Sequence, residues 1–85
     1  MHSKNHKAIT KLERLHLGQV KSLPCSVCDA APPSEAHHIK QQQHFTTVAL
    51  CVSCHQSWHG LKLIWNVKKM DELSALNVTI ERIRA

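Results

Sequence analysis

Apolar residues recur at helical spacing near the start of the chain. Within residues 5–18, Ile9, Leu12 and Leu15 follow one another at intervals of three, and Gly18 is a candidate stop. Because such a stripe faces one side of a helix, the pattern predicts an N-terminal helix that packs against the rest of the fold.

A second apolar stripe predicts helices in the last part of the chain. From residue 61 onward, it consists of Leu63, Val67, Met70, Leu73 and Leu76. Asn77 is a candidate break in this helix. Residues 78–84 are expected to add a last short helix, with Thr79 as its cap.

The middle of the chain has a different pattern. Three prolines punctuate residues 22–36, which are expected to be irregular. Two short strands are predicted at residues 37–40 and 45–50, the second because it is rich in β-branched residues. A short helix from residue 51 to Gly60 follows. The sequence therefore predicts a small α+β fold.

The chain is short and basic, which limits the classes of protein to which it can belong. Its 85 residues are expected to form one domain, residues 1–85, and the aromatic side chains are only Phe45, Trp58 and Trp65. Both tryptophans are expected to anchor a thin core, and a domain of this size usually needs a disulfide, a metal or a partner. The formal net charge of +5 favours nucleic acid as a partner.

Neither a membrane nor export is indicated. No segment approaches the roughly 20 apolar residues that span a bilayer. The polar N-terminus leads into no apolar region typical of a secretory signal. The protein is therefore expected in the cytoplasm, where reduced cysteines favour metal binding over disulfides.

Four cysteines form two pairs with the spacing of zinc ligands. Cys25 and Cys28 make one Cys-x-x-Cys pair, and Cys51 and Cys54 make the other. Two such turns place four thiolates around one tetrahedral ion, so a closed structural zinc site with no cysteine left over is predicted. Zinc binding would also supply folding energy that the thin core lacks.

One competing motif overlaps the second cysteine pair. Cys51, Cys54 and His55 also match Cys-x-x-Cys-His, the pattern of covalent haem attachment, and Met70 could be a second axial ligand. This interpretation is disfavoured, because haem attachment commonly requires export and would leave the first cysteine pair without a role.

Four of the eight histidines lie at positions typical of metal ligands. His37 and His38 are adjacent, whereas His55 and His59 are four residues apart and so share one face of a helix. His55 follows the second cysteine pair directly. That pair would therefore determine where the helix begins and where both imidazoles point.

Together these residues make the chain resemble the HNH, or ββα-metal, endonucleases. The resemblance, within residues 25–60, is carried by Cys25-Ser-Val-Cys28, Ala36-His37-His38-Ile39-Lys40 and Leu50-Cys51-Val-Ser-Cys54-His55-Gln-Ser-Trp-His59-Gly60. The order of motifs is most similar to small phage nucleases of the RecA-dependent, recombination-enhancement type. The implied fold is a zinc-stabilised, treble-clef-like ββα-metal core with an N-terminal helix and C-terminal helices.

The resemblance assigns a role to each of the four histidines. It implies that His37, His55 and His59 bind a catalytic divalent metal (Mg²⁺, Mn²⁺, Ni²⁺ or Zn²⁺) and that His38 is the general base. Unprotonated near pH 7, His38 can take a proton from water. Three protein ligands leave the metal open to phosphate and water.

The sequence departs from the family pattern at one position. Family members commonly have Asn shortly before the third cysteine, where it holds the loop behind the general base. Thr46 stands there, with His44 nearby, so these two residues are the candidates for positioning the loop.

The resulting prediction is a metal-dependent DNA endonuclease that nicks with little sequence specificity and takes part in phage recombination. DNA is the expected partner and a recombination protein a second candidate, in the cytoplasm of a bacterium or phage-infected host. Candidate phosphate contacts are Lys40, Lys62, Lys68 and Lys69. The alternative is a non-enzymatic zinc module that binds nucleic acid, which explains the cysteines and the charge but not the placement of the histidines.

Overall fold

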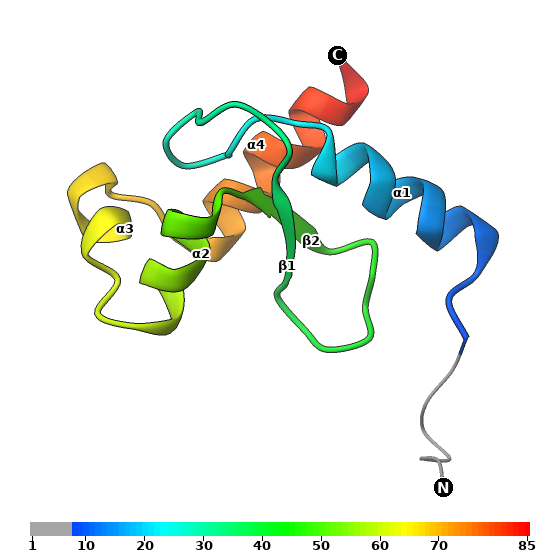
Figure 1. Cartoon of the computed structure of the whole chain (residues 1–85), viewed down its shortest axis with the longest axis horizontal. Helices are drawn as coiled ribbons and strands as arrows, with labels where there is room; N and C mark the ends of the chain where they lie inside the picture. Colours follow the sequence, from blue (N-terminus) through cyan, green and yellow to red (C-terminus); the bar gives the residue numbers. More distant parts are fainter. Residues whose placement is uncertain (1–7) are drawn as a thin grey trace, which may run out of the picture.

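Residues 8–85, the part of the chain that the computed structural model describes, form four helices and a two-stranded antiparallel sheet, and three of these helices pack against the sheet (Figure 1). In chain order the elements are α1 (Lys11–Lys21), β1 (Glu35–His38), β2 (Thr47–Leu50), α2 (Val52–His59), α3 (Leu63–Lys68) and α4 (Glu72–Arg84). The predicted α+β class is confirmed. None of these helices has the length and apolar character needed to cross a bilayer.

The sheet pairs the segment that carries the adjacent histidines with a buried strand. In the antiparallel register, His37 lies opposite Val48. All four residues of β2 are buried, because α1, α2 and α4 pack around it. β1 begins before the predicted segment 37–40, and β2 forms only the last part of the predicted segment 45–50. The residues just before Thr47 form a hydrogen-bonded turn instead.

Helix α1 begins and ends later than the apolar pattern predicts. Thr10 and Glu13 form a capping box, in which each side chain accepts the other residue's backbone N–H, and the helix starts at the residue after Thr10. It then runs through Gly18, the expected stop, to Lys21. Residues 5–7 of the predicted helix lie outside the described residues.

The apolar stripe of α1 does not pack as expected. Leu12 and Leu15 are 71% and 58% exposed, and the buried residue of this helix is Val20. Figure 1 shows the reason: the C-terminal end of α1 lies beside the sheet and α4, whereas its first turns extend away from them.

The predicted helix over residues 61–76 is two helices in the structure. α3 ends where Lys69 adopts the left-handed conformation, with φ of 56°. α4 begins after Asp71, whose carboxylate accepts the Ser74 N–H at 2.7 Å; this hydrogen bond lowers the pKa of the Asp71 carboxyl. An Asp cap is a helix-start signal that apolar spacing alone overlooks.

The predicted break at Asn77 and cap at Thr79 are also wrong, because both residues lie inside α4. The predicted stripe is not a core face either, since Leu63, Val67 and Leu73 are exposed. Of the stripe, only Met70 and Leu76 pack against the core, because the break between α3 and α4 interrupts the helical spacing on which the stripe depends.

Trp65 anchors the small core from α3. It is 1% exposed, and its indole N–H donates to the Cys54 carbonyl at 2.8 Å. Trp58 is partly buried and packs against it, with ring centroids 4.7 Å apart. The expectation that both tryptophans anchor the core is confirmed, and Leu50 and Ala75 belong to the same cluster.

A buried pair of hydroxyl groups joins α4 to the rest of the core. Thr79 Oγ1 lies 2.7 Å from Ser26 Oγ, donates to the Ala75 carbonyl and accepts the Ala49 N–H. Ser26 lies between the first two cysteines. This contact therefore ties α4 both to that loop and to β2.

Replacing Thr79 with Val should destabilise the fold although the side chain keeps nearly the same shape. The Thr79→Val variant leaves the buried hydroxyl of Ser26 without its partner, and we expect the free energy of unfolding to fall by about 1–3 kcal/mol. Urea denaturation measures this change. Asn77→Ala, an exposed change in the same helix, should stay within about 0.5 kcal/mol of wild type. Equal stability of Thr79→Val and wild type would show that the hydroxyl pair contributes nothing.

Candidate metal centres

Both cysteine pairs converge beside the start of α2. Cys25 and Cys28 lie in the loop after α1, whereas Cys51 caps the N-terminus of α2 and Cys54 lies in its first turn. The four sulfur atoms lie within 4.8 Å of one another, and those of Cys28 and Cys51 are 3.6 Å apart. All four are free thiols. The structure thus brings together the complete predicted set of sulfur ligands.

Backbone N–H groups point at these sulfurs. The Val27 N–H donates to Cys25 Sγ and the Cys54 N–H to Cys51 Sγ, each at 3.4 Å. The first pair is closed into a tight turn by a hydrogen bond from the Asp29 N–H to the Cys25 carbonyl, with Asp29 left-handed at φ 64°. Such N–H groups stabilise a thiolate, which is the form that binds a metal.

The thiols differ in how easily they lose a proton. Burial raises the pKa of Cys25, but hydrogen bonds from backbone N–H groups, that of Cys28 foremost, outweigh it and lower that pKa to about 7. Burial and the neighbouring sulfurs raise the pKa of Cys54 above its usual range. One divalent cation could displace these protons, and four thiolates are the ligand set of structural zinc. The cluster can therefore hold a structural metal such as zinc.

Helix α4 braces the first cysteine pair through Arg82. Its guanidinium donates to the carbonyls of Pro24 and Cys25 and pairs with the Asp29 carboxylate. These contacts join the end of α4 to the loop that carries two of the sulfurs. They also place a positive charge near a cluster that is negative when its thiols are deprotonated.

Purified protein should contain one tightly held zinc ion at the cysteines, and its removal should unfold the chain. The core is too small to be stable alone, so we expect a chelator that strips the zinc to abolish the cooperative thermal transition. Metal analysis paired with circular dichroism melting measures both quantities. An unchanged melting curve for metal-free protein would contradict this account of the cysteines.

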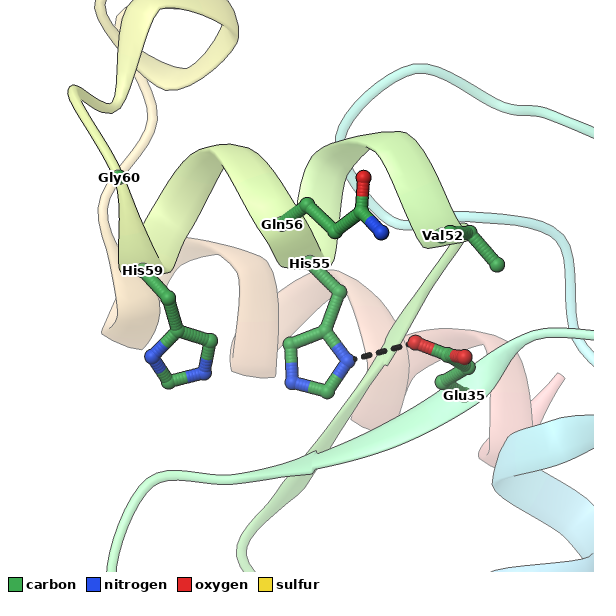
Figure 2. Close-up of a pocket in the computed structure, with 6 residues that line it drawn as sticks. All are labelled: Glu35, Val52, His55, Gln56, His59 and Gly60. Carbon is green, nitrogen blue, oxygen red and sulfur yellow. Dashed lines mark hydrogen bonds and ion pairs between the residues drawn. The ribbon is translucent and has the colours of Figure 1, made fainter.

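Three of the four predicted histidines form a second cluster. His37 comes from β1, and His55 and His59 come from successive turns of α2, with their rings on the same side of that helix (Figure 2). One donor nitrogen of each lies within 4.8 Å of the other two. His37 is 3% exposed, His55 is partly buried and His59 is exposed. The cluster therefore has a buried inner wall and an open outer side.

Two glutamates that sequence reasoning missed orient these imidazoles. His37 Nε2 donates to Glu72 Oε2 at 2.6 Å, and His55 Nδ1 donates to Glu35 Oε1 at 2.8 Å (Figure 2 shows the second bond). Metal-binding histidines commonly donate their second ring N–H to a carboxylate in this way. Glu35 precedes His37 by two residues on the same face of β1, so that spacing was a usable signal; no local pattern points to Glu72.

These hydrogen bonds determine which nitrogen of each ring is free. With protons on Nε2 of His37 and Nδ1 of His55, the two remaining nitrogens each carry a lone pair and lie 3.2 Å apart. Two bare lone pairs repel at this distance, so a cation between them is favoured. Two nitrogens bound to one tetrahedral zinc ion at roughly 2.1 Å would be about 3.4 Å apart, close to the observed separation. The donor set is thus chemically suited to a divalent metal.

His38 lies outside this cluster. Adjacent residues of a strand point to opposite faces of a sheet, and His38 Nε2 lies 2.9 Å from His44 Nδ1, in the loop between β1 and β2. Burial lowers the pKa of His38, and electrostatic interactions with the neighbouring His44, His37 and Lys21 lower it further. His38 is therefore neutral near pH 7 and able to accept a proton.

The two loop-positioning candidates differ in what they contact. His44 makes the contact with the His38 ring. The Thr46 hydroxyl instead donates to the Gln43 carbonyl at 3.2 Å, within the same loop. The geometry therefore places His44, rather than Thr46, beside the predicted general base.

An open cleft of about 400 Å³ borders the histidine cluster (Figure 2). It is lined by Glu35, Val52, His55, Gln56, His59 and Gly60. Two of the three clustered histidines line this cleft, so a phosphate group from solvent could reach a metal held there. The cysteine cluster is more closed, because two of its four members are buried.

One of the four predicted phosphate-contacting lysines has a defined side-chain contact. Lys62 Nζ is 4.2 Å from the centroid of the Trp58 ring, and that ring is 6.2 Å from the His37 ring. The other three are exposed, with Lys40 in the loop after β1 and Lys68 and Lys69 at the end of α3. The structure thus places Lys62 over the Trp58 ring.

No family model, curated protein or solved structure matches the chain. The resemblance to the HNH endonucleases therefore rests on the motif residues of this chain and on where the structure places them. What the structure defines is a small α+β protein with a four-cysteine cluster that can hold a structural metal such as zinc.

Proposed function

We propose that the protein is a metal-dependent DNA endonuclease of the HNH, or ββα-metal, type. The observation that carries the proposal is the cluster of three imidazoles, open to solvent on one side, next to a neutral histidine on the same strand. These are the groups that the sequence resemblance assigns to metal binding and to general base catalysis.

The order of the elements supports a ββα-metal core. β1, β2 and α2 follow one another and carry the clustered histidines on the first strand and the helix. The cysteine cluster joins the loop before β1 to the start of α2. A treble-clef-like core stabilised by zinc would account for both features.

Hydrolysis of a phosphodiester needs an activated water, stabilisation of the charge on the phosphate and neutralisation of the leaving oxygen. His38, neutral near pH 7, would take the proton from the water, and His44 would hold the His38 ring through their contact. A divalent ion on the three imidazoles would supply the charge stabilisation. Lys62, held over Trp58, would attract the DNA backbone.

The proposal extends to substrate and setting. The net charge of +5 favours DNA, and backbone-directed binding by so small a site implies nicking with little sequence specificity. Following the same resemblance, we propose a role in phage recombination, with a recombination protein as a partner. The cytoplasm of a bacterium or phage-infected host would keep the four thiols reduced.

A second candidate, a non-enzymatic zinc module that binds nucleic acid, is favoured by one observation: His38 points to the opposite face of β1 from His37 and contacts the loop residue His44. Metal content separates the two functions. The nuclease should bind a second divalent ion through the histidines, whereas the module should bind only the zinc held by the cysteines.

The test of the proposed function is nicking of supercoiled plasmid by zinc-loaded protein in the presence of Mg²⁺, Mn²⁺ or Ni²⁺. His38→Ala should lower the nicking rate by about 10²–10⁴-fold, because the water loses its general base. The His6→Ala variant, which changes a histidine without an assigned role, should cut like wild type. Metal content and thermal stability of His38→Ala should not change.

Two outcomes would overturn the proposed function. One is the failure of wild type to nick DNA with any of these ions. The other is undiminished nicking by His38→Ala, which would assign the activity to a different residue or to a contaminating nuclease.

Binding of DNA should depend on salt partly through Lys62. In a His38→Ala background, which prevents cutting, adding Lys62→Ala should reduce the slope of log affinity against log salt concentration by about 1. Fluorescence anisotropy with labelled duplex DNA measures the slope. Lys11→Ala, which removes an equal charge at the far end of α1, should leave the slope unchanged, and equal slopes for both variants would remove Lys62 from the DNA-binding surface.

A further inference from the structure

Helix α4 reaches the histidine cluster through its first residue, Glu72. The carboxylate lies 2.6 Å from Nε2 of His37, whose ring is almost sealed from solvent. The Glu72 side chain is itself 24% exposed. A hydrogen bond from a buried imidazole to a partly buried carboxylate orients the ring more strongly than an ion pair between exposed side chains does.

Contacts along α4 hold Glu72 in place. Asp71 accepts the Ser74 N–H and so fixes where the helix starts. Further along, Thr79 and Arg82 are hydrogen-bonded to the loop of the first cysteine pair. Sliding of α4 along the sheet would break contacts at both ends, so the carboxylate is presented to His37 at one defined position.

We propose that Glu72 is a positioning residue of the histidine metal centre. By accepting a hydrogen bond from the Nε2–H of His37, Glu72 leaves Nδ1 as the ligand atom and holds that nitrogen opposite Nε2 of His55, 3.2 Å away. It also places a negative charge behind the ring, which makes the imidazole a better donor to a cation. This assignment rests on the proposed function, because it requires that the histidines bind a metal.

The geometry distinguishes this role from that of a ligand. The two nitrogens of an imidazole point outward from different edges of the ring. A carboxylate bonded to Nε2 therefore cannot share an ion held by Nδ1 of the same ring. Glu72 acts through His37, and an effect of its removal on metal binding must pass through that residue.

Titration of zinc-loaded protein with Co²⁺, followed by the visible absorption of the bound ion, tests the assignment without measuring DNA cleavage. Glu72→Ala should weaken Co²⁺ binding by about 10–100-fold. Glu72→Gln should lose less, because the amide oxygen can still accept from Nε2 although the charge is gone. Glu81→Ala, which removes an equal charge from an exposed position of α4, should bind like wild type.

Thermal melting and zinc content of each variant show whether α4 is still folded. If Glu72→Ala binds Co²⁺ as tightly as wild type, the positioning role is wrong. It is also wrong if Glu81→Ala loses as much affinity for Co²⁺ as Glu72→Ala does. If wild type binds Co²⁺ but does not nick DNA, the proposed nuclease activity is wrong, whereas the positioning role of Glu72 still stands. Failure of wild type to bind any Co²⁺ at the histidines would overturn both.

Discussion

The arrangement of this small protein depends on the meeting of four cysteine sulfurs at the start of α2. The cluster joins the loop after α1 to the first turn of that helix, across a core that contains few large side chains. Since Cys51 caps α2, the cluster also determines where the helix starts. The direction in which His55 and His59 point follows from that start, one and two turns later. The cysteine cluster thus positions two of the three clustered histidines.

Helix α4 contacts both the loop of the first cysteine pair and the histidine cluster. Near its C-terminal end, Thr79 and Arg82 bind the loop of the first cysteine pair, and at its first residue Glu72 binds His37. A helix outside the β1–β2–α2 segment therefore contributes to the geometry of both. α4 therefore has a structural role in this short chain although it contains none of the proposed ligands.

Sequence spacing identified those candidate metal-binding residues that lie within one helical turn or one tight turn of each other. The cysteine pairs and the pair of His55 and His59 were visible because their geometry is local. Glu72 and Thr79 were not, because their partners lie more than thirty residues away and no local pattern marks them. The apolar stripe predicts one helix over residues 61–76, whereas the Asp71 cap begins a new helix within that range. Strand alternation, which turns His38 toward the loop, could have been predicted from the adjacency of the two histidines alone.

X-ray absorption at the zinc edge tests most directly whether the chain binds two metal ions, one through the four cysteines and one through the three histidines. Protein loaded with one equivalent of zinc should show four sulfur neighbours at about 2.3 Å. A second equivalent should add nitrogen neighbours at about 2.0–2.1 Å, while the zinc–sulfur distance stays the same and the sulfur number averaged over both ions falls to about two. His55→Ala should prevent the appearance of the nitrogen neighbours. A single ion with mixed sulfur and nitrogen ligands, or no ordered nitrogen shell at the second equivalent, would contradict the account.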